Sequence, residues 1–406
     1  MTDGVTTTSN PPSGWAYRIR LGADRAPADF DRTMVWAIVA LLTCFGLIMV
    51  LSSSAVESFA AGDGVSSKFI KQFIFATIGF LAMYFTSKLP MTFWTGHVAT
   101  LLLVVTIILQ LLVFTPLGVT LGGNRAWLNL GFTTLQPAEI GKLAMSVWIA
   151  RIVTIKRKPI VKWQHLLVPV LLPALTIIGL ALAGKDLGTV MVMGALLLGC
   201  LWFSDMPAHW TVVGGIVAAG GAVLMAAISP NRVRRITEFF SGECDYLNGC
   251  WQTSHGFYAL AHGGLLGVGL GNSTAKWSWL PEADNDYIFA IIGEEFGLFG
   301  AVVVLLIFLA LALVLLRLWK RAKAAGARVI IGGVFTWIFF QAFVNIAVVV
   351  GLLPVLGVPL PFVSSGGSAL VTTLLAMGIV LSVAKSDSAS VNSRRTPKKR
   401  KEPVRR

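Results

Sequence analysis

The sequence has little charge. Only 13% of its 406 residues are Asp, Glu, Lys or Arg, whereas 55% are hydrophobic, and the mean hydropathy is +0.76. The period-two alternation of a membrane β-barrel is absent, as are a repeat of fixed period and a separate soluble domain. The first thirty residues lack the apolar core of a cleavable signal peptide. The composition therefore excludes a soluble protein and indicates a polytopic helical membrane protein.

Apolar runs long enough to cross a bilayer recur along the chain. Because every backbone polar group in hydrocarbon must be satisfied within its segment, these runs predict helices. The fold expected is all-α, with about ten transmembrane helices, the first of which is also the signal anchor. The predicted spans are residues 34–51, 69–85, 98–114, 137–153, 166–183, 187–203, 210–228, 287–315, 329–353 and 368–383.

The basic residues predict the orientation of these spans. They gather in the N-terminal segment, after the fourth and eighth spans, and in the tail, and ten spans place all four regions on one side. Both termini are therefore expected to be cytoplasmic, with the long loop 229–285 outside. This topology explains the net charge of +14 without nucleic acid as a partner. The organisation expected is a cytoplasmic segment 1–33, a membrane domain 34–384 and a basic, disordered tail 385–406.

Acidic residues are concentrated at one place. Five of the 19 acidic residues fall within the stretch 276–300, KWSWLPEADNDYIFAIIGEEFGLFG. Ionised groups near hydrocarbon are costly and usually mark a pathway or a reaction site. Glu282, Asp284 and Asp286 precede the eighth span. Glu294 and Glu295 lie within it, about 12 Å deeper at helical rise, and are expected to line a cavity or to pair with a base from another span.

Two polar segments offer cations for a phosphate-bearing ligand. In the segment 122–142, Arg125 and Lys142 could bind phosphate, or Glu139 and Lys142 could form an internal pair that makes a buried span tolerable. In the segment 184–189, Lys185 could belong to the same cationic site, although a simple interfacial turn is the preferred interpretation.

The long loop and the segment 352–370 are the two remaining polar segments that interrupt the apolar pattern. Arg232, Arg234 and Arg235 fit either an amphipathic surface segment or a diphosphate site. Cys244 and Cys250 could form a disulfide outside the membrane. His255 and His262 do not indicate a metal, because two further ligands of metal-binding type are not evident. The prolines and the SSGG sequence of 352–370 predict a broken helix that lines the same cavity as the acidic residues.

Four motifs resemble the SEDS family of bacterial membrane proteins (shape, elongation, division and sporulation). They are QPAEIGK, KDLGTV, LPEADNDYIFAIIGEEFG and GLLPVLGVPLPFVSSGGS, in family order, and the resemblance covers nearly all of 34–383. It implies a peptidoglycan glycosyltransferase that polymerises lipid II outside the cytoplasmic membrane, with Asp286 as the essential aspartate. Asp284 and Asn285 depart from a frequent His-Thr of the family, and Arg125 lies one position earlier than usual.

The segment VLSSSAVES resembles the division branch of the family more than the elongation branch. That branch implies a location at the septum, other division proteins, and a class B penicillin-binding protein that crosslinks the new strands. A polymerase for elongation, a transporter that flips lipid II and a scaffold are the alternatives. The scaffold explains the buried polar residues least well.

The expected chemistry is an inverting transfer. Asp286 is assigned as general base on the acceptor hydroxyl, and cations stabilise the departing diphosphate. The side chains expected to bind substrate or diphosphate are Lys142, Lys185, Arg125, Arg232, Arg234, Arg235, Glu282, Gln252, Ser364 and Ser365. A divalent cation, Mg²⁺ or Mn²⁺, could be held by the diphosphate with Asp286 or Glu282, and no other cofactor is expected.

Overall fold

The predicted spans coincide with helices wherever the chain is described. The computed structural model describes residues 27–60, 62, 64–131, 133–156, 167–204, 250–277 and 279–395, and only scattered residues between 205 and 249. The described helices are α1 (Pro27–Ala60), α2 (Ser67–Lys88), α3 (Met91–Trp94), α4 (His97–Leu112), α5 (Pro137–Ile155), η1 (Leu167–Leu171), α7 (Leu172–Ala183), α8 (Leu187–Trp202), α11 (Trp251–Gly263), α12 (Ile288–Arg321), α13 (Ala325–Val349) and α14 (Gly367–Arg395). The predicted seventh span lies largely outside the described residues.

Length and composition support the membrane assignment of most of these helices. Among the described residues, α1, α2, α12, α13 and α14 contain stretches long and apolar enough to cross a membrane, and α4, η1 with α7, and α8 are shorter apolar helices. Helix α5 is different, because it carries the buried charges Glu139 and Lys142. Its Pro137 occupies the first turn, where the missing N–H costs nothing.

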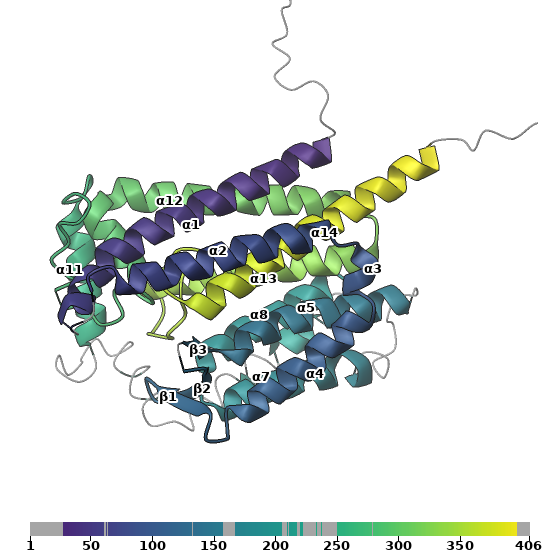
Figure 1. Ribbon diagram of the computed structural model, residues 1–406, viewed down its shortest axis with the longest axis horizontal. Helices are drawn as coiled ribbons and strands as arrows, with labels where there is room; N and C mark the ends of the chain where they lie inside the picture. The colour runs from purple at the N-terminus through teal and green to yellow at the C-terminus, as the bar shows by residue number, and fades with distance from the viewer. Residues whose placement is uncertain are drawn as a thin grey trace, which may run out of the picture.

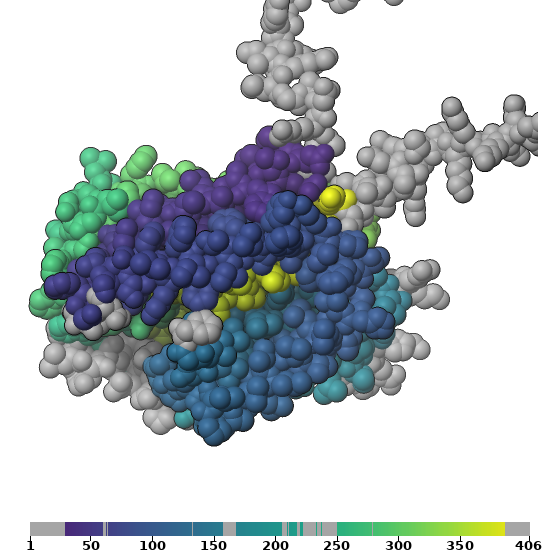
Figure 2. Space-filling view, in the orientation of Figure 1, coloured from purple at the N-terminus to yellow at the C-terminus, as the bar shows by residue number. Residues whose placement is uncertain are grey.

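The helices pack closely and nearly along a common direction (Figure 1). Helix α2 lies along α14, α1 along α12, and α13 along both α5 and α8. Figure 2 shows α1 and α2 side by side on one face, with part of α14 visible beside α2. Glycines permit these approaches, since a Cβ at Gly378 of α14 would lie 2.6 Å from a carbonyl oxygen of α2.

A small sheet was not expected from the sequence, which predicted helices alone. Strands β1 (Gly118–Leu121), β2 (Asn124–Asn129) and β3 (Thr134–Leu135) form an antiparallel sheet in the order β1-β2-β3. Gly122 and Gly123 both have positive φ and make the turn between β1 and β2. The N–H of Arg125 donates to Gly184 O at 2.9 Å, so the sheet is attached to the turn between α7 and α8.

Helix α12 is interrupted near its start. Gly297 has φ 66° and ψ −165°, which is not helical, so a short helical segment precedes the long one. The loop after α11 packs into this break, where Leu298 N donates to Gly264 O and Phe299 N to Leu265 O. The acidic stretch therefore lies on a separate short segment rather than at the top of one straight span.

Candidate active site

Asp286 lies in the turn immediately before α12, and its backbone carbonyl is held by a side chain of α13. Asn345 of α13 donates through Nδ2 to Asp286 O at 2.8 Å and to Val358 O at 2.7 Å. The carboxyl group faces Gly357, where an added Cβ would lie 3.5 Å from Oδ2. Its Oδ1 is buried and has no hydrogen-bond partner among the described residues. A buried carboxylate oxygen without a donor is costly in a purely structural position, and such groups are frequent at reaction sites.

The surroundings of Asp286 oppose its ionisation. Burial raises its pKa from 3.8 to about 7, and the negative charges of Glu282, Asp186 and Asp284 act in the same direction. A carboxyl group with a pKa near neutrality is suited to exchange a proton with a substrate hydroxyl.

Glu282 shapes the turn that presents Asp286. It is exposed and has φ 55°, a left-handed conformation that is strained for a residue with a side chain. Its carbonyl accepts hydrogen bonds from the N–H groups of Asn285 and Tyr287, both at 3.1 Å. Its Oε2 also accepts from Asn285 Nδ2 at 3.1 Å. Glu282 thus fixes the loop geometry, and its charge lies close enough to influence Asp286.

Asp284 joins the acidic segment to three other parts of the chain. Its Oδ2 accepts from Lys68 Nζ at 3.2 Å and from Ser365 Oγ at 2.8 Å, and Lys68 also pairs with Glu57 at 2.7 Å. Ser364 donates through Oγ to Asn285 O at 2.7 Å. The 352–370 segment therefore contacts the acidic cluster, and Ser364 and Ser365 support the turn directly. That the two line one cavity stays a prediction.

Lys142 lies within the protein rather than at an opening. Its side chain is 1% exposed, and Nζ donates to Glu139 Oε1 at 2.7 Å and to Gln341 Oε1 at 3.0 Å. It also lies 4.6 Å from the centroid of the Trp337 ring. This arrangement is the internal pair that the sequence offered as an alternative to phosphate binding. The pairing offsets the cost of burying two charges of α5 where this helix packs against α13.

The other predicted cations occupy different positions. Arg125 is exposed, but its guanidinium donates to Val113 O at 3.0 Å and Thr115 O at 2.9 Å. Lys185 is exposed on the turn before α8 with φ 66°, next to the buried Asp186. Asp186 caps α8 by accepting from Thr189 N at 3.1 Å. Gln252 donates from α11 to Pro281 O at 3.1 Å, and Arg232, Arg234 and Arg235 lie outside the described residues.

Glu294 and Glu295 form two separate buried sites. Glu294 accepts from Thr274 Oγ1 at 2.8 Å, from Thr274 N at 2.9 Å, from His262 Nδ1 at 2.9 Å and from Ser273, and it lines a cavity as predicted. Glu295 accepts from Ser52 Oγ at 2.6 Å and pairs with Lys276 Nζ at 3.4 Å. A base does pair with Glu295, although Lys276 comes from the preceding loop rather than from another span.

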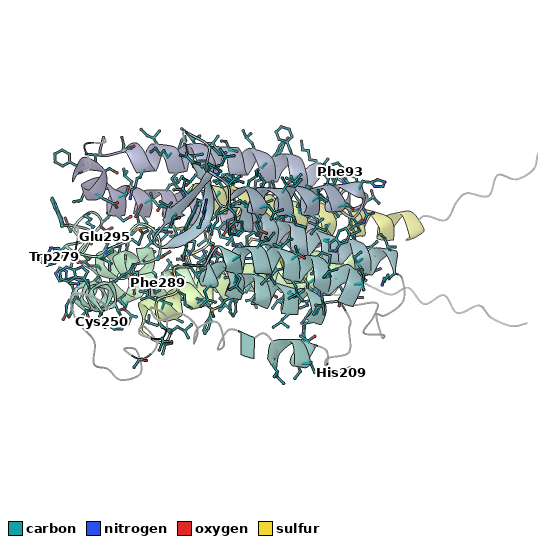
Figure 3. The ribbon with its side chains drawn as sticks, turned by 90° about the horizontal axis from the view of Figure 1, so that it is seen from below. Phe93, His209, Cys250, Trp279, Phe289 and Glu295 are labelled. Atoms are coloured by element: carbon teal, nitrogen blue, oxygen red, sulfur yellow. The ribbon has the colours of Figure 1, made fainter. Side chains whose placement is uncertain are left out.

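The depth predicted for these two glutamates assumed one straight helix, whereas α12 is interrupted at Gly297. In Figure 3, Glu295 lies nearer than Phe289 to the end of the molecule marked by Trp279, so the short segment before Gly297 approaches that end. The depth of the two glutamates relative to Asp286 stays a prediction.

The described residues offer few metal ligands in one place. Within that part of the chain, no three His, Cys, Asp or Glu side chains converge as a metal site. Cys250 is disulfide-bonded, in accord with the predicted oxidation of the loop, whereas Cys244 lies outside the described residues. Cys44 and Cys200 are free thiols.

Several known proteins are similar to this chain. Residues 32–389 match the FtsW/RodA/SpoVE family, described as "Cell cycle protein". The chain is 33% identical to the "Probable peptidoglycan glycosyltransferase FtsW" of Mycobacterium tuberculosis, over 96% of this chain and 74% of that protein. It is 35% identical to "Stage V sporulation protein E" of Bacillus subtilis, over 86% and 95%.

Solved structures share the fold. A chain of the structure described as "Structural coordination of polymerization and crosslinking by a peptidoglycan synthase complex" aligns with a TM-score of 0.70 and 24% identity, over 87% of this chain and 97% of that one. The rod shape determining protein RodA of Thermus thermophilus aligns with a TM-score of 0.64 and 23% identity, over 87% and 96%. At these identities, the structures support the arrangement of helices.

Proposed function

The chain belongs to the FtsW/RodA/SpoVE family, and from that premise we propose that it is a peptidoglycan glycosyltransferase that polymerises lipid II on the outer face of the cytoplasmic membrane. The names of its relatives support the activity, since several at 31–33% identity are called peptidoglycan glycosyltransferases. The observation that carries the mechanism is Asp286, a carboxyl group with a buried, unpartnered oxygen and a pKa near neutrality.

Asp286 acts as the general base of a single displacement. Its carboxylate accepts the proton of the acceptor sugar's 4-hydroxyl while that oxygen attacks the anomeric carbon of the donor. The new glycosidic bond forms as the bond from that carbon to the diphosphate breaks, so the anomeric configuration inverts. Asn345, Glu282 and Ser364 position the base through the turn, without touching the reacting atoms.

The leaving diphosphate requires positive charge. Lys185 is the best-placed candidate in the described chain, because it is exposed and adjoins Asp186, whose charge acts on Asp286. Arg125 lies close to Lys185 along the backbone, because its N–H donates a hydrogen bond to the carbonyl oxygen of Gly184, the residue before Lys185. Arg232, Arg234 and Arg235 remain candidates in the long loop.

A divalent cation fits this site only with help from the substrate. Asp286 Oδ1 and the exposed Glu282 can supply oxygens, but the described residues do not complete a protein-only set. Mg²⁺ or Mn²⁺ would therefore take its other ligands from the diphosphate and from water, and when bound it would offset negative charge there.

The activity is tested by giving lipid II to the purified protein and separating the glycan products by size. We expect strands from the wild type and none from Asp286→Ala or Asp286→Asn, with thermal unfolding unchanged or improved. The matched control is Asp29→Asn, which removes an exposed carboxylate at the start of α1. Strand formation by a folded Asp286→Ala protein would reject the assignment. Movement of lipid II between leaflets without strand formation by the wild type would favour the transporter.

The division branch and the partner belong to the same proposal. The FtsW and sporulation relatives support the division branch over a role in elongation. We propose a class B penicillin-binding protein as partner, together with other division proteins at the septum. We expect the chain to co-purify with such a transpeptidase. We also expect a fluorescently tagged form of the chain to concentrate at the division site.

A further inference from the structure

A cavity lies beside α11. Its volume is about 400 Å³, and it is lined by residues of α11, of the 273–279 loop and of α12. Asp286 is not among its lining residues, so the reaction proposed above does not account for it. Cavities of this size, with aromatic walls and a few polar groups, are typical of sites for small ligands.

The walls of this cavity present aromatic rings in a layered arrangement. The Trp279 ring stacks on His255 at 5.6 Å and on Trp251 at 5.9 Å, with interplanar angles of 19° and 17°. Trp279 is 53% exposed, and Tyr258, which also lines the cavity, is 60% exposed. Large, accessible ring faces of this kind can cover the C–H face of a sugar ring.

The floor of the cavity supplies an oriented hydrogen-bonding group. Glu294 is fully buried, and its carboxylate binds His262 Nδ1 at 2.9 Å. A carboxylate at Nδ1 fixes the orientation of the His262 ring, so Nε2 is the ring nitrogen left to hydrogen-bond a ligand. Among the described residues that line the cavity, none is Lys or Arg. The site therefore suits a neutral hydroxyl-bearing ligand better than a diphosphate.

Helix α11 connects this cavity to the catalytic turn. Gln252 binds Pro281 O on one side of the helix, and a Cβ at Gly256 would lie 2.6 Å from the Tyr287 ring. Trp279 and Glu294 flank the turn on either side in the sequence. A ligand that reaches from the cavity to the catalytic turn would thus contact two sides of the unit that α11 and this turn form.

From this arrangement we propose that the cavity binds sugar residues of the newly made glycan strand and retains the strand between successive additions. The inference rests on the proposed polymerase function. Trp279, Tyr258 and His262 contact the strand, and Glu294 positions His262. Retention of the strand between additions would lengthen the strands made before release.

The binding test uses the full-length wild-type chain and a lipid-free peptidoglycan tetrasaccharide, titrated by calorimetry. We expect Trp279→Ala and His262→Ala to weaken this binding by at least about tenfold, as the loss of a stacking face or an oriented hydrogen bond predicts. Trp277→Ala is the matched control, since Trp277 is 62% exposed, close in sequence and not a lining residue. It should bind as the wild type does.

Strand length provides a second measurement. With lipid II, Trp279→Ala should yield shorter strands than Trp277→Ala. Asp286→Asn should make no strands yet still bind the tetrasaccharide, so a failure of the polymerase proposal is distinguishable from a failure of this one. The inference is overturned if the wild type does not bind the tetrasaccharide, or if Trp279→Ala binds as well as Trp277→Ala. Loss of a co-purifying transpeptidase in Trp279→Ala, with no saccharide bound by the wild type, would instead make this surface a protein interface.

Discussion

The most consequential residue is a carboxyl group whose surroundings work against its charge. Three acidic neighbours raise the pKa of Asp286. No described residue donates a hydrogen bond to Oδ1, where it would favour the charged form. A structural aspartate would be expected to have donors at both oxygens, as Asp186 has from Thr189 N at Oδ1 and from Gln136 Nε2 at Oδ2. This difference separates the proposed base from Asp186.

The raised pKa of Asp286 predicts how activity depends on pH. Only the ionised form can accept a proton, so strand formation should rise with pH and reach half its plateau near pH 7. At pH 6 a single ionisation leaves about a tenth of the plateau rate. Glu282→Gln removes one of the negative charges that raise the pKa, and should move the profile to lower pH. The measurement is the initial rate of lipid II polymerisation across pH.

The control for this profile is Asp29→Asn, whose charge lies at the beginning of α1 and should leave the midpoint in place. A rate that does not change between about pH 5 and pH 8 would show that Asp286 is not the titrating base. A midpoint raised by Glu282→Gln would contradict the electrostatic cause.

At this scale the sequence predicted the position of the proposed base but not its supports. Asp286 stands out because charge is rare in the chain and because its motif is distinctive. Lys68 and Asn345 were missed, since each reaches the acidic segment from a distant helix through a single contact. The sequence left two interpretations of Lys142 open, a phosphate ligand or an internal partner of Glu139. The internal environment becomes visible only in the structure, where Lys142 also contacts Gln341 and Trp337.

At the level of elements, the break in α12 is what separates the acidic turn from the transmembrane helix. The loop after α11 occupies the break through backbone hydrogen bonds on both sides of Gly297, such as Val268 N to Glu294 O at 3.0 Å and Leu298 N to Gly264 O at 2.9 Å. Gly297 itself has a conformation that residues with side chains rarely adopt.

Gly297→Ala should therefore disrupt this unit. The added Cβ would lie 2.4 Å from Gly267 N and 2.5 Å from Leu265 O, in backbone that cannot easily move. The unfavourable φ alone costs about 1–3 kcal/mol, and the clash adds to it. We expect a lower unfolding temperature in detergent, measured by tryptophan fluorescence, and loss of strand formation.

A matched glycine in a helix gives the comparison. Gly194 of α8 has open space around its Cβ position, so Gly194→Ala should leave the unfolding temperature unchanged or raise it slightly. Equal behaviour of the two variants would mean that the break at Gly297 is not required.

The helices were far easier to predict than their interruptions. Uninterrupted apolar runs indicate spans directly, and each predicted span in the described chain has its helix. The strands β1 to β3 are short and lie in a polar segment, so neither length nor alternation identified them. The break at Gly297 was also missed, because the glycine lies inside the long stretch that was taken as a single span.

For the molecule as a whole, the arrangement of ends agrees with the predicted topology. Helix α1 begins and α14 ends at the same end of the molecule, and α11 lies at the opposite end (Figure 1). At the first end, Arg321 binds the buried Asp31 and so joins the start of α1 to the end of α12. Arg317 and Arg321, which are among the basic residues predicted to be cytoplasmic, thus share an end with the start of α1.

Cysteine labelling tests which end faces outward. Trp277→Cys introduces a thiol near α11, and Lys320→Cys introduces one near the end of α12, both at exposed positions. A membrane-impermeant maleimide should label Trp277→Cys in intact cells and Lys320→Cys only after the membrane is opened, because the acidic turn is expected on the exterior face. The unmodified chain, with free Cys44 and Cys200, gives the background. The reverse pattern would put Asp286 on the cytoplasmic side and make polymerisation outside the membrane untenable for this chain.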